Sequence, residues 1–319
     1  MHLMKICVAL SALLAGAAFA QTKWDMPTPY ADGSFHTKGV RQFADEIAKG
    51  GKLQITVHSN ASLIKHPEIK RAVQTGQVPI GELLISVLAN ESPLFAFDSN
   101  PFLANGYGRE KKLWGIARPY LEKRLDAQGI KLLYSVPRPP QALWAKKAIL
   151  SIADMKGLKF RTYSPTTSRL AELVGAVPTT VQLPEVPQAF RTGVVDLMIT
   201  SSPGGVDTQA WDYLTHFYDT QAFLPQNVVL VNKAAFGKLD AATQKAILGA
   251  AARAEKQGWA ASEADNAKAI KMLGEKGIKV AKPSAKLAGE LAAIGKTIAA
   301  EWAKKAGPEG EAILNAYNK

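Results

Sequence analysis

The stretch from residue 153 to residue 202 constrains the fold most strongly, because it alternates strand, helix, strand, helix and strand. Residues 157–161 form the first predicted strand, and Ser164-Pro165 opens the next helix with a capping hydroxyl and a proline at the first helical position. This alternation is typical of an α/β fold with a largely parallel sheet. Ligands of open α/β sheets bind in the crevice beyond the carboxyl ends of the strands. We therefore expect a binding site where the first strand ends.

Arg161 is the residue at that strand end. Its planar, permanently charged guanidinium suits a carboxylate, because it can donate two parallel hydrogen bonds to the two oxygens. An arginine in such a place is more often a solvated surface charge or one half of an internal salt bridge. However, the amide donors at the start of the following helix also favour an anion. We predict that Arg161 binds the carboxylate of an organic acid.

Residues 1–20 have the pattern of a secretory signal peptide, with Lys5 before an apolar run over 6–17 and Ala18-Phe19-Ala20 as the cleavage motif. The run is too short to span a bilayer, and no later stretch has about 18 uninterrupted apolar residues. The only cysteine, Cys7, lies inside this segment, so no disulfide is expected in the mature chain. The sequence predicts an exported protein that is free in the periplasm.

Removal of the first 20 of 319 residues would leave 299, which is enough for two domains with full hydrophobic cores. The formal net charge of +12 would become +11 without Lys5. A basic balance can indicate nucleic acid or an anionic membrane as the partner. Because the basic residues are dispersed and not interleaved with aromatic residues, we expect no nucleic-acid binding. The charge would instead help to attract an anionic solute.

The first half of the chain also alternates strands and helices, up to a proline-rich turn at residues 137–140. Residues 239–274 are predicted to form one helix of about 50 Å, which is longer than a single lobe is wide. We expect residues 21–144 with about 230–270 to form lobe I. Residues 145–229 with about 271–319 are expected to form lobe II.

Catalytic motifs are absent from the sequence, which contains no G-x-S-x-G, H-E-x-x-H, P-loop or G-x-G-x-x-G pattern. The four histidines beyond the signal segment show no metal-ligand spacing, and His58 and His66 are interpreted as surface residues. Ser201 precedes two glycines, but no general base for it can be identified. We expect no enzymatic activity and no cofactor. The sequence has no clustered carboxylates that require a metal, and whether a metal ion bridges the ligand stays open at this point.

Several segments together resemble one protein family. They are AVQTGQV at 72–78, DMKGLKFR at 154–161, VGAVP at 174–178, Glu185 with Ala189, Phe190 and TGVVD at 192–196, and LPQN at 224–227. Each segment alone is a weak signal, but the combination is fairly specific. Over nearly the whole mature length, the chain resembles the extracytoplasmic solute-binding proteins of tripartite ATP-independent periplasmic (TRAP) transporters, the DctP family.

The resemblance implies an α/β fold of two periplasmic-binding-protein-like lobes, joined by crossing strands and by a long helix that spans both. It also implies that Arg161 is the carboxylate-binding arginine. Gln141 occupies a site where some relatives carry a second arginine, and residues 200–202 stand where others present an asparagine. Both differences predict a less cationic pocket that accepts one carboxylate.

Further candidates for ligand contact are chosen by residue type. Phe35, Tyr163 and Trp211 would supply apolar contacts, which favours an aromatic or short aliphatic monocarboxylate. Thr200, Ser201 and Ser202 would supply hydroxyls, which suits a 2-oxo or 2-hydroxy acid. Asn227 and Glu82 complete the candidate set. Glu82 either accepts a hydrogen bond from a ligand hydroxyl or is simply solvated.

The resemblance implies delivery of the solute to TRAP-type membrane subunits by a monomeric receptor. Two alternatives stay open at this point. A binding protein of this kind can instead serve an ATP-driven importer or a sensor, and a periplasmic enzyme is a more distant alternative.

Overall fold

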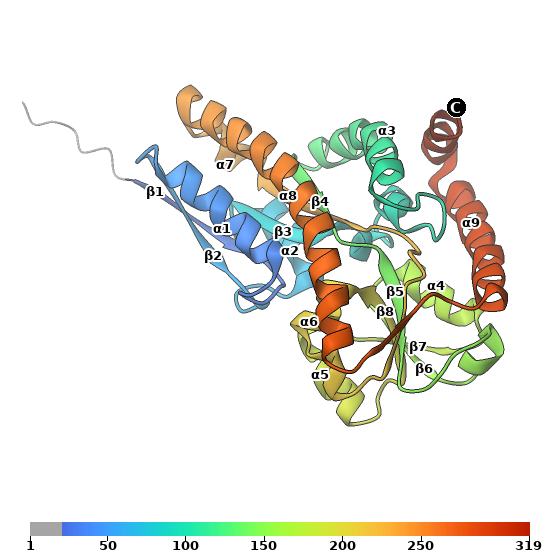
Figure 1. Cartoon of the computed structure of the whole chain (residues 1–319). Helices are drawn as coiled ribbons and strands as arrows, with labels where there is room; N and C mark the ends of the chain where they lie inside the picture. Colours follow the sequence, from blue (N-terminus) through green and yellow to red (C-terminus); the bar gives the residue numbers. More distant parts are fainter. Residues whose placement is uncertain (1–20) are drawn as a thin grey trace, which may run out of the picture.

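The computed structural model describes residues 21–319, which form two lobes with a long helix running across them (Figure 1). The predicted signal peptide lies outside these residues. Within the described part of the chain, no helix is both long and apolar enough to cross a membrane.

Lobe I contains a parallel strand pair and an antiparallel sheet. The pair is β1 (Thr22–Pro27) with β2 (Leu53–His58), and the sheet has the order β3 (Ile80–Leu84), β10 (Gln226–Asn232) and β4 (Ile130–Pro137). The helices of this lobe are α1 (Phe35–Ala48), α2 (Ile69–Thr75), α3 (Tyr107–Asp126) and α7 (Lys233–Gly237). In α1 the apolar residues recur at helical spacing, so that Val40, Phe43, Ala44 and Ile47 are all buried against the strands.

Lobe II is built on one mixed sheet. Its strand order is β11 (Lys279–Ala281), β9 (His216–Tyr218), β5 (Gln141–Ala145), β8 (Leu197–Ser201), β6 (Lys159–Thr162) and β7 (Val177–Thr180). The helices α4 (Pro165–Leu173), α5 (Val186–Arg191) and α6 (Ser202–Asp207) connect or follow these strands. The predicted alternation over residues 153–202 is therefore confirmed. Because β6 runs parallel to both β7 and β8, the carboxyl ends of these three strands meet at one edge of the sheet.

Two crossing segments join the lobes and are hydrogen-bonded to each other. The first links β4 to β5 through residues 138–140, and the second links β9 to β10 through residues 219–225. The Arg138 amide donates to the Pro225 carbonyl at 2.8 Å, and the Gln141 amide donates to the Phe223 carbonyl at 2.9 Å. The chain passes from one lobe to the other through these two segments.

The helix α8 (Ala241–Glu275) is the long helix expected from the sequence, and it crosses both lobes (Figure 1). Its first turn is capped by Asp240, whose side chain accepts a hydrogen bond from the Thr243 amide at 3.0 Å. It packs on α1 and β4 of lobe I and on α6 and β11 of lobe II. At 35 residues it is about 50 Å long, which is enough to reach across both.

The helix α9 (Ala285–Tyr317) contacts both lobes, although the sequence placed it in lobe II alone. Its first half packs into the lobe II core through Leu287 and Leu291, and its second half reaches the lobe I core through Trp302 and Ile313. The non-helical Gly307, with φ 64°, separates its last turns from the rest.

Candidate functional site

A small cavity lies between the lobes and contains two buried arginine side chains. Its walls are formed by residues of both lobes and of the first crossing segment: Tyr30, His66, Leu84, Arg138, Gln141, Arg161, Tyr163, Gln182, Leu183 and Thr200. Of the residues predicted from sequence, Arg161, Gln141, Tyr163 and Thr200 are brought together here. The cavity is at the carboxyl ends of β6 and β8, where an α/β sheet binds its ligands.

Arg161 is the next-to-last residue of β6 and its side chain is 3% exposed. Its Nε donates to the Val181 carbonyl at 2.8 Å, and its guanidinium carbon lies 4.8 Å from the centre of the Tyr163 ring. Within residues 21–319 it forms no ion pair. Burial lowers the pKa of Arg161 to about 10, so it remains a cation at neutral pH.

Arg138 provides a second buried cation, which the sequence analysis missed. It is 5% exposed, its guanidinium carbon lies 4.7 Å from the centre of the Tyr30 ring, and its Nη2 reaches the Ser201 hydroxyl at 3.5 Å. Among the described residues, its Nη1 has no hydrogen-bond acceptor and no carboxylate pairs with it. The cavity is therefore more cationic than the glutamine at position 141 suggested. The signal in the sequence was the arginine inside the proline-rich crossing segment.

Polar side chains of lobe II surround the two arginines in fixed orientations. Gln141 donates from Nε2 to the Pro139 carbonyl at 3.1 Å and accepts from the Tyr163 hydroxyl at 3.0 Å. Thr200 lines the cavity at the end of β8. The next residue, Ser201, is buried and caps α6 by accepting from the Gly204 amide at 3.3 Å. These contacts hold the wall of the cavity in place before any solute arrives.

Lobe I contributes Tyr30, whose position depends on a buried hydrogen-bond network. The Tyr30 hydroxyl donates to Asn227 Oδ1 at 3.0 Å, and Asn227 Nδ2 donates to Glu82 Oε1 at 2.9 Å. Glu82 also accepts from the Thr28 hydroxyl at 2.5 Å and lies 3.2 Å from His36 Nδ1. Asn227 and Glu82, both predicted as ligand contacts, thus support Tyr30 from behind and do not line the cavity.

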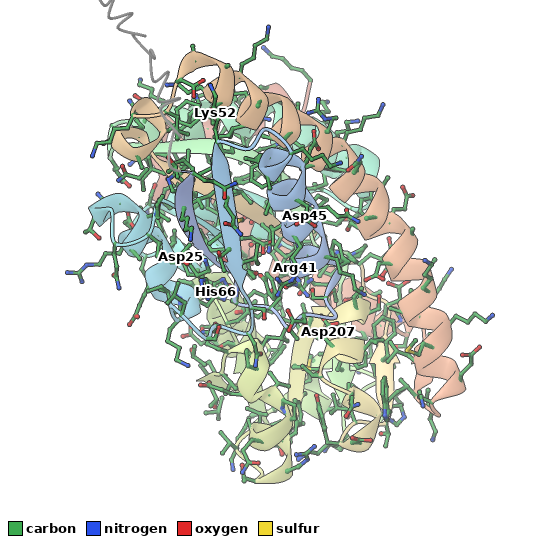
Figure 2. All side chains as sticks on the ribbon, turned by 90° about the vertical axis from the view of Figure 1, so that its left-hand side faces the viewer. Asp25, Arg41, Asp45, Lys52, His66 and Asp207 are labelled. Carbon is green, nitrogen blue, oxygen red and sulfur yellow. The ribbon has the colours of Figure 1, made fainter. Side chains whose placement is uncertain are left out.

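His66 makes a direct contact between the lobes, and its interpretation as a surface residue is wrong. It is 8% exposed and lies where the blue elements of lobe I meet the yellow-green elements of lobe II (Figure 2). Its Nε2 accepts from the Leu84 amide at 3.0 Å, so Nδ1 carries the proton and donates to Gln182 Oε1 of lobe II at 3.2 Å. Burial lowers the pKa of His66 to about 4.

The other predicted contacts lie elsewhere. Phe35 faces a different pocket, in lobe I, and Trp211 is half-buried beside the Lys276 ammonium. Ser202 donates to Asn266 of α8 at 2.6 Å. Near the start of α4, the Tyr163 and Ser164 amides donate to the Thr167 hydroxyl, and the Thr167 amide donates to the Ser164 hydroxyl.

The cavity has about 30 Å³ of open space, which restricts it to very small solutes unless the lobes part. A larger pocket of about 540 Å³ lies between α1 and α8. Its buried acid, Glu82, is already hydrogen-bonded, and no arginine lines it. The unpaired buried cations lie in the smaller cavity, and such cations are costly without a counter-charge. No group of three or more potential metal-ligating side chains is found among residues 21–319.

Comparison with known proteins gives a consistent result. A family model described as bacterial extracellular solute-binding protein, family 7 (DctP), matches residues 28–305. The solved structure of DctP7 from Bordetella pertussis, an extracytoplasmic solute receptor binding pyroglutamic acid, is 50% identical with a TM-score of 0.92, and the match covers 93% of this chain and 100% of that one.

Two further relatives extend the comparison. A marine metagenome TRAP solute binding protein, specific for pyroglutamate and solved with co-purified pyroglutamate, is 39% identical with a TM-score of 0.92, over 93% of this chain and 99% of that one. A solute-binding protein of Verminephrobacter eiseniae is 30% identical over 274 residues, which are 82% of this chain and 80% of that protein.

Proposed function

This chain belongs to family 7 of the bacterial extracellular solute-binding proteins, the DctP family. We propose that it captures a small monocarboxylic acid of the pyroglutamate type and delivers this acid to TRAP-type membrane subunits. The observation that carries the proposal is the pair of buried guanidiniums, Arg161 and Arg138, in one interlobe cavity without a carboxylate partner among the described residues. A carboxylate from solution would supply the missing charge.

The remaining lining suits a compact ring that carries its own polar groups. Pyroglutamate has one carboxylate and a lactam with one N–H donor and one C=O acceptor. The cavity presents two side-chain amides, Gln141 and Gln182, together with the Thr200 hydroxyl, while Leu84 and Leu183 offer apolar contact. Two relatives at 50% and 39% identity bind pyroglutamate. Aromatic, 2-oxo and 2-hydroxy monocarboxylates are the next candidates, since they share the carboxylate and a nearby acceptor.

Binding would be coupled to closure of the lobes. The cavity takes Tyr30, His66 and Leu84 from lobe I and Arg161 from lobe II, so a solute in it touches both. Such a solute stabilises the closed form by the contacts that exist only there. Micromolar affinity corresponds to about 8 kcal/mol, of which hydrogen bonds to a charged group supply ~1.5–3 each. The rest would come from apolar burial and neutral hydrogen bonds.

Mass spectrometry of the solute released on denaturing the purified protein tests the proposal, followed by thermal-shift measurements with L-pyroglutamate and a panel of mono- and dicarboxylates. We expect pyroglutamate or a close analogue to be released and to raise the melting temperature most. A dicarboxylate such as succinate as the tightest ligand would contradict the assignment.

The same panel separates a receptor from an enzyme, because a receptor returns every compound unchanged after incubation. Reconstitution with TRAP membrane subunits from the same genome separates delivery to a gradient-driven transporter from service to an ATP-driven importer or a sensor. We expect uptake to require these subunits and an ion gradient.

A further inference from the structure

A buried carboxylate lies behind the lobe I wall of the cavity that contains Arg138 and Arg161, the arginine cavity. Glu82 is on β3 and is 2% exposed. Asn227 Nδ2 donates to Glu82 Oε1 at 2.9 Å, and the Tyr30 hydroxyl donates to Asn227 Oδ1 at 3.0 Å. Because Tyr30 lines the cavity, two hydrogen bonds connect Glu82 to a side chain of the cavity wall.

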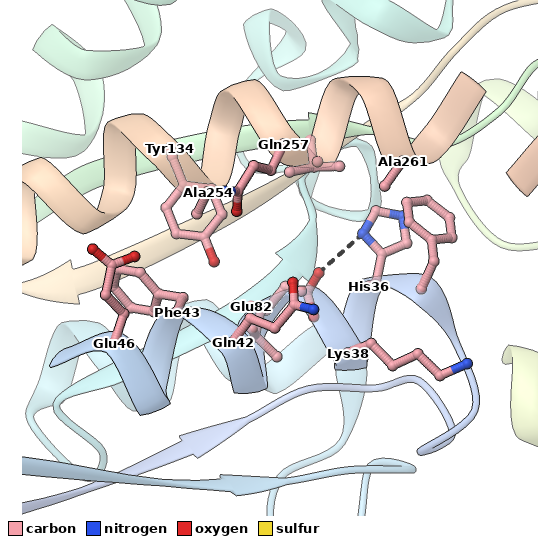
Figure 3. A pocket seen from close by; sticks show the side chains of 15 residues that line it. His36, Lys38, Gln42, Phe43, Glu46, Glu82, Tyr134, Ala254, Gln257 and Ala261 are labelled. Atoms are coloured by element: carbon pink, nitrogen blue, oxygen red, sulfur yellow. Dashed lines mark ion pairs between the residues drawn. The ribbon is translucent and has the colours of Figure 1, made fainter. Parts of the chain in front are cut away.

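Glu82 is ionised at neutral pH, although its partners are neutral. Thr28, Asn227 and His36 donate hydrogen bonds to its oxygens, and Figure 3 shows the contact with His36 as a dashed line. Burial lowers the pKa of His36 to about 4, so the imidazole carries no charge at neutral pH. Burial also acts to raise the pKa of Glu82, but the hydrogen bonds from the three partners outweigh it, and the pKa lies below its ordinary value. A fixed negative charge therefore remains in the interior of lobe I.

Other buried acids carry less charge than Glu82. Within residues 21–319, the other carboxyl groups that are at most 2% exposed are Asp98 and Glu110. Burial raises the pKa of Asp98 to about 7 and the pKa of Glu110 well above its ordinary value. Burial raises the pKa of the half-buried Asp207 of lobe II as well. Of the three most deeply buried acids, Glu82 is thus the one that keeps its full charge at neutral pH.

The electric field of Glu82 reaches the cavity wall, where it opposes the field of the arginines. His66 lines the cavity, and its pKa is sensitive to the local potential. Burial is the main reason that this pKa is low; the negative charge of Glu82 raises it, and the positive charges of Arg138 and Arg161 lower it. Tyr30 responds in the same sense, since burial raises its pKa, Arg138 lowers it and Glu82 raises it. A solute beside these two side chains is therefore subject to charges of both signs.

A fixed negative charge of this kind discriminates between anions by their net charge. Coulomb interactions between buried groups are only weakly screened by water and salt. The free energy of repulsion is proportional to the charge of the solute, so a dianion held in the cavity is repelled about twice as strongly as a monoanion. Glu82 thus reduces affinity for every anion, but it reduces affinity for a dianion more, which is how a repulsive element gives specificity.

We propose that Glu82 is a specificity-determining residue, whose buried charge behind Tyr30 makes the arginine cavity select monoanions over dianions. Glu82 does not touch the solute and acts on it through its electric field. The inference rests on the proposed function in one respect, namely that an organic acid binds beside Arg138 and Arg161.

Glu82→Gln removes the charge and can keep the hydrogen bonds. Glu82 Oε1 accepts from both Asn227 and His36, while Oε2 accepts from Thr28. A glutamine carbonyl oxygen can take the place of Oε1, and the glutamine amide can donate to the Thr28 hydroxyl oxygen. Because a buried charge without an ionic partner is lost, the free energy of unfolding should stay the same or rise.

Two variants serve as controls. Glu82→Asp keeps the charge but shortens the side chain, so it changes the packing alone. Glu46→Gln removes an acid of the same lobe that lies near the other end of α1 and is already paired with Arg253 (Figure 3).

The test is calorimetric titration with three ligands of different charge: neutral L-pyroglutamamide, L-pyroglutamate and succinate. Ligands that bind weakly are measured by competition with L-pyroglutamate. We expect Glu82→Gln to strengthen binding of L-pyroglutamate about fivefold and binding of succinate by about the square of this factor, roughly 25-fold, with no change for the amide. Glu82→Asp and Glu46→Gln should keep the affinity ratios of the wild type.

A change by the same factor for all three ligands, or an unchanged ratio of L-pyroglutamate to its amide, would overturn the proposal, because a structural role of Glu82 affects all ligands alike. A Glu82→Gln protein that does not fold would also overturn it, since the charge would then be needed for stability. If the wild type prefers a different carboxylate, the proposed function fails, and that acid and its own amide take the place of the pyroglutamate pair in the same test.

Discussion

Arg161 and Arg138 are both at most 5% exposed and line the same cavity. Burial lowers the pKa of Arg161, and the positive charge of Arg138 lowers it further. Two unpaired guanidiniums so placed reduce the stability of the unliganded closed form. This cost is recovered when an anion binds, so the arrangement makes closure dependent on the solute. Tyr163 and Tyr30 lessen the cost, since each places a ring beside one guanidinium.

Arg138→Leu is expected to separate affinity from stability. Loss of one guanidinium should weaken binding of the acid by ~1.5–3 kcal/mol, or roughly 10- to 150-fold. The melting temperature of the unliganded protein should stay the same or rise, because an unpaired buried cation is removed. Calorimetric titration and thermal unfolding measure the two effects. Unchanged affinity would show that Arg138 does not face the solute.

His66 predicts a loss of stability in acid. Its pKa is about 4 in the folded protein against an ordinary value of 6.5, so the neutral form is favoured by folding. The resulting contribution to the free energy of unfolding is complete above pH 6.5 and is lost as the pH falls from 6.5 towards 4. Over this range the free energy of unfolding changes by up to about 1.4 kcal/mol per pH unit. Urea unfolding across this range should give a shallower slope for His66→Asn than for the wild type. Equal slopes for His66→Asn and the wild type would show that His66 is not held neutral in the folded state.

At the residue scale, the sequence predicted that Arg161 lies at a strand end, because the end of a strand can be recognised from the neighbouring residues. Arg138 and His66 could not be placed in the same way, because each reaches the cavity only through tertiary packing. Arg138 is positioned by the pairing of the two crossing segments, and His66 by the contact of lobe I with Gln182. Phe35 and Trp211 were chosen for residue type alone, and both point elsewhere.

Among the elements, α8 combines contacts to both lobes with one very close approach. A Cβ at Gly258 would lie 2.3 Å from Val136 Cγ2 on β4, so only glycine fits where the helix crosses this strand. The hydrophobic spacing of α8 predicted its length, but the role of Gly258 depends on the strand beneath it. The division of α9 between the lobes was missed for the same reason, since its apolar face is continuous in sequence and its two halves meet different cores.

Gly258→Ala should therefore destabilise the protein by ~1–3 kcal/mol, despite the higher helix propensity of alanine, because the added methyl overlaps Val136. The double variant Gly258→Ala, Val136→Ala should recover part of this loss. Gly249→Ala in the same helix meets only the end of the Arg253 side chain at 3.5 Å and should be neutral or stabilising. Chemical unfolding of the wild type and the three variants measures their free energies of unfolding. A higher free energy of unfolding for Gly258→Ala than for the wild type would contradict the close packing.

For the whole molecule, the sequence was sufficient for the two-lobed α/β fold and for the family, since regular alternation of strands and helices extends over most of the chain. What it did not provide is the closed geometry. The crossing segments at residues 138–140 and 219–225 bond to each other, and α8 and α9 lie across both lobes. The His66 to Gln182 hydrogen bond then holds the lobes together beside the arginines. Because the cavity has only about 30 Å³ of open space, a solute of the size of pyroglutamate requires the lobes to part further than in this arrangement.

Calorimetric titration of Arg161→Ala with L-pyroglutamate, beside the wild type, tests the central claim most directly. Removal of a buried charge partner costs about 2–5 kcal/mol, so affinity should fall at least roughly 30-fold, from a micromolar dissociation constant to tens of micromolar or weaker, while the circular dichroism spectrum stays native. Near-normal affinity in a folded Arg161→Ala protein would contradict the assignment of this arginine as the carboxylate-binding residue.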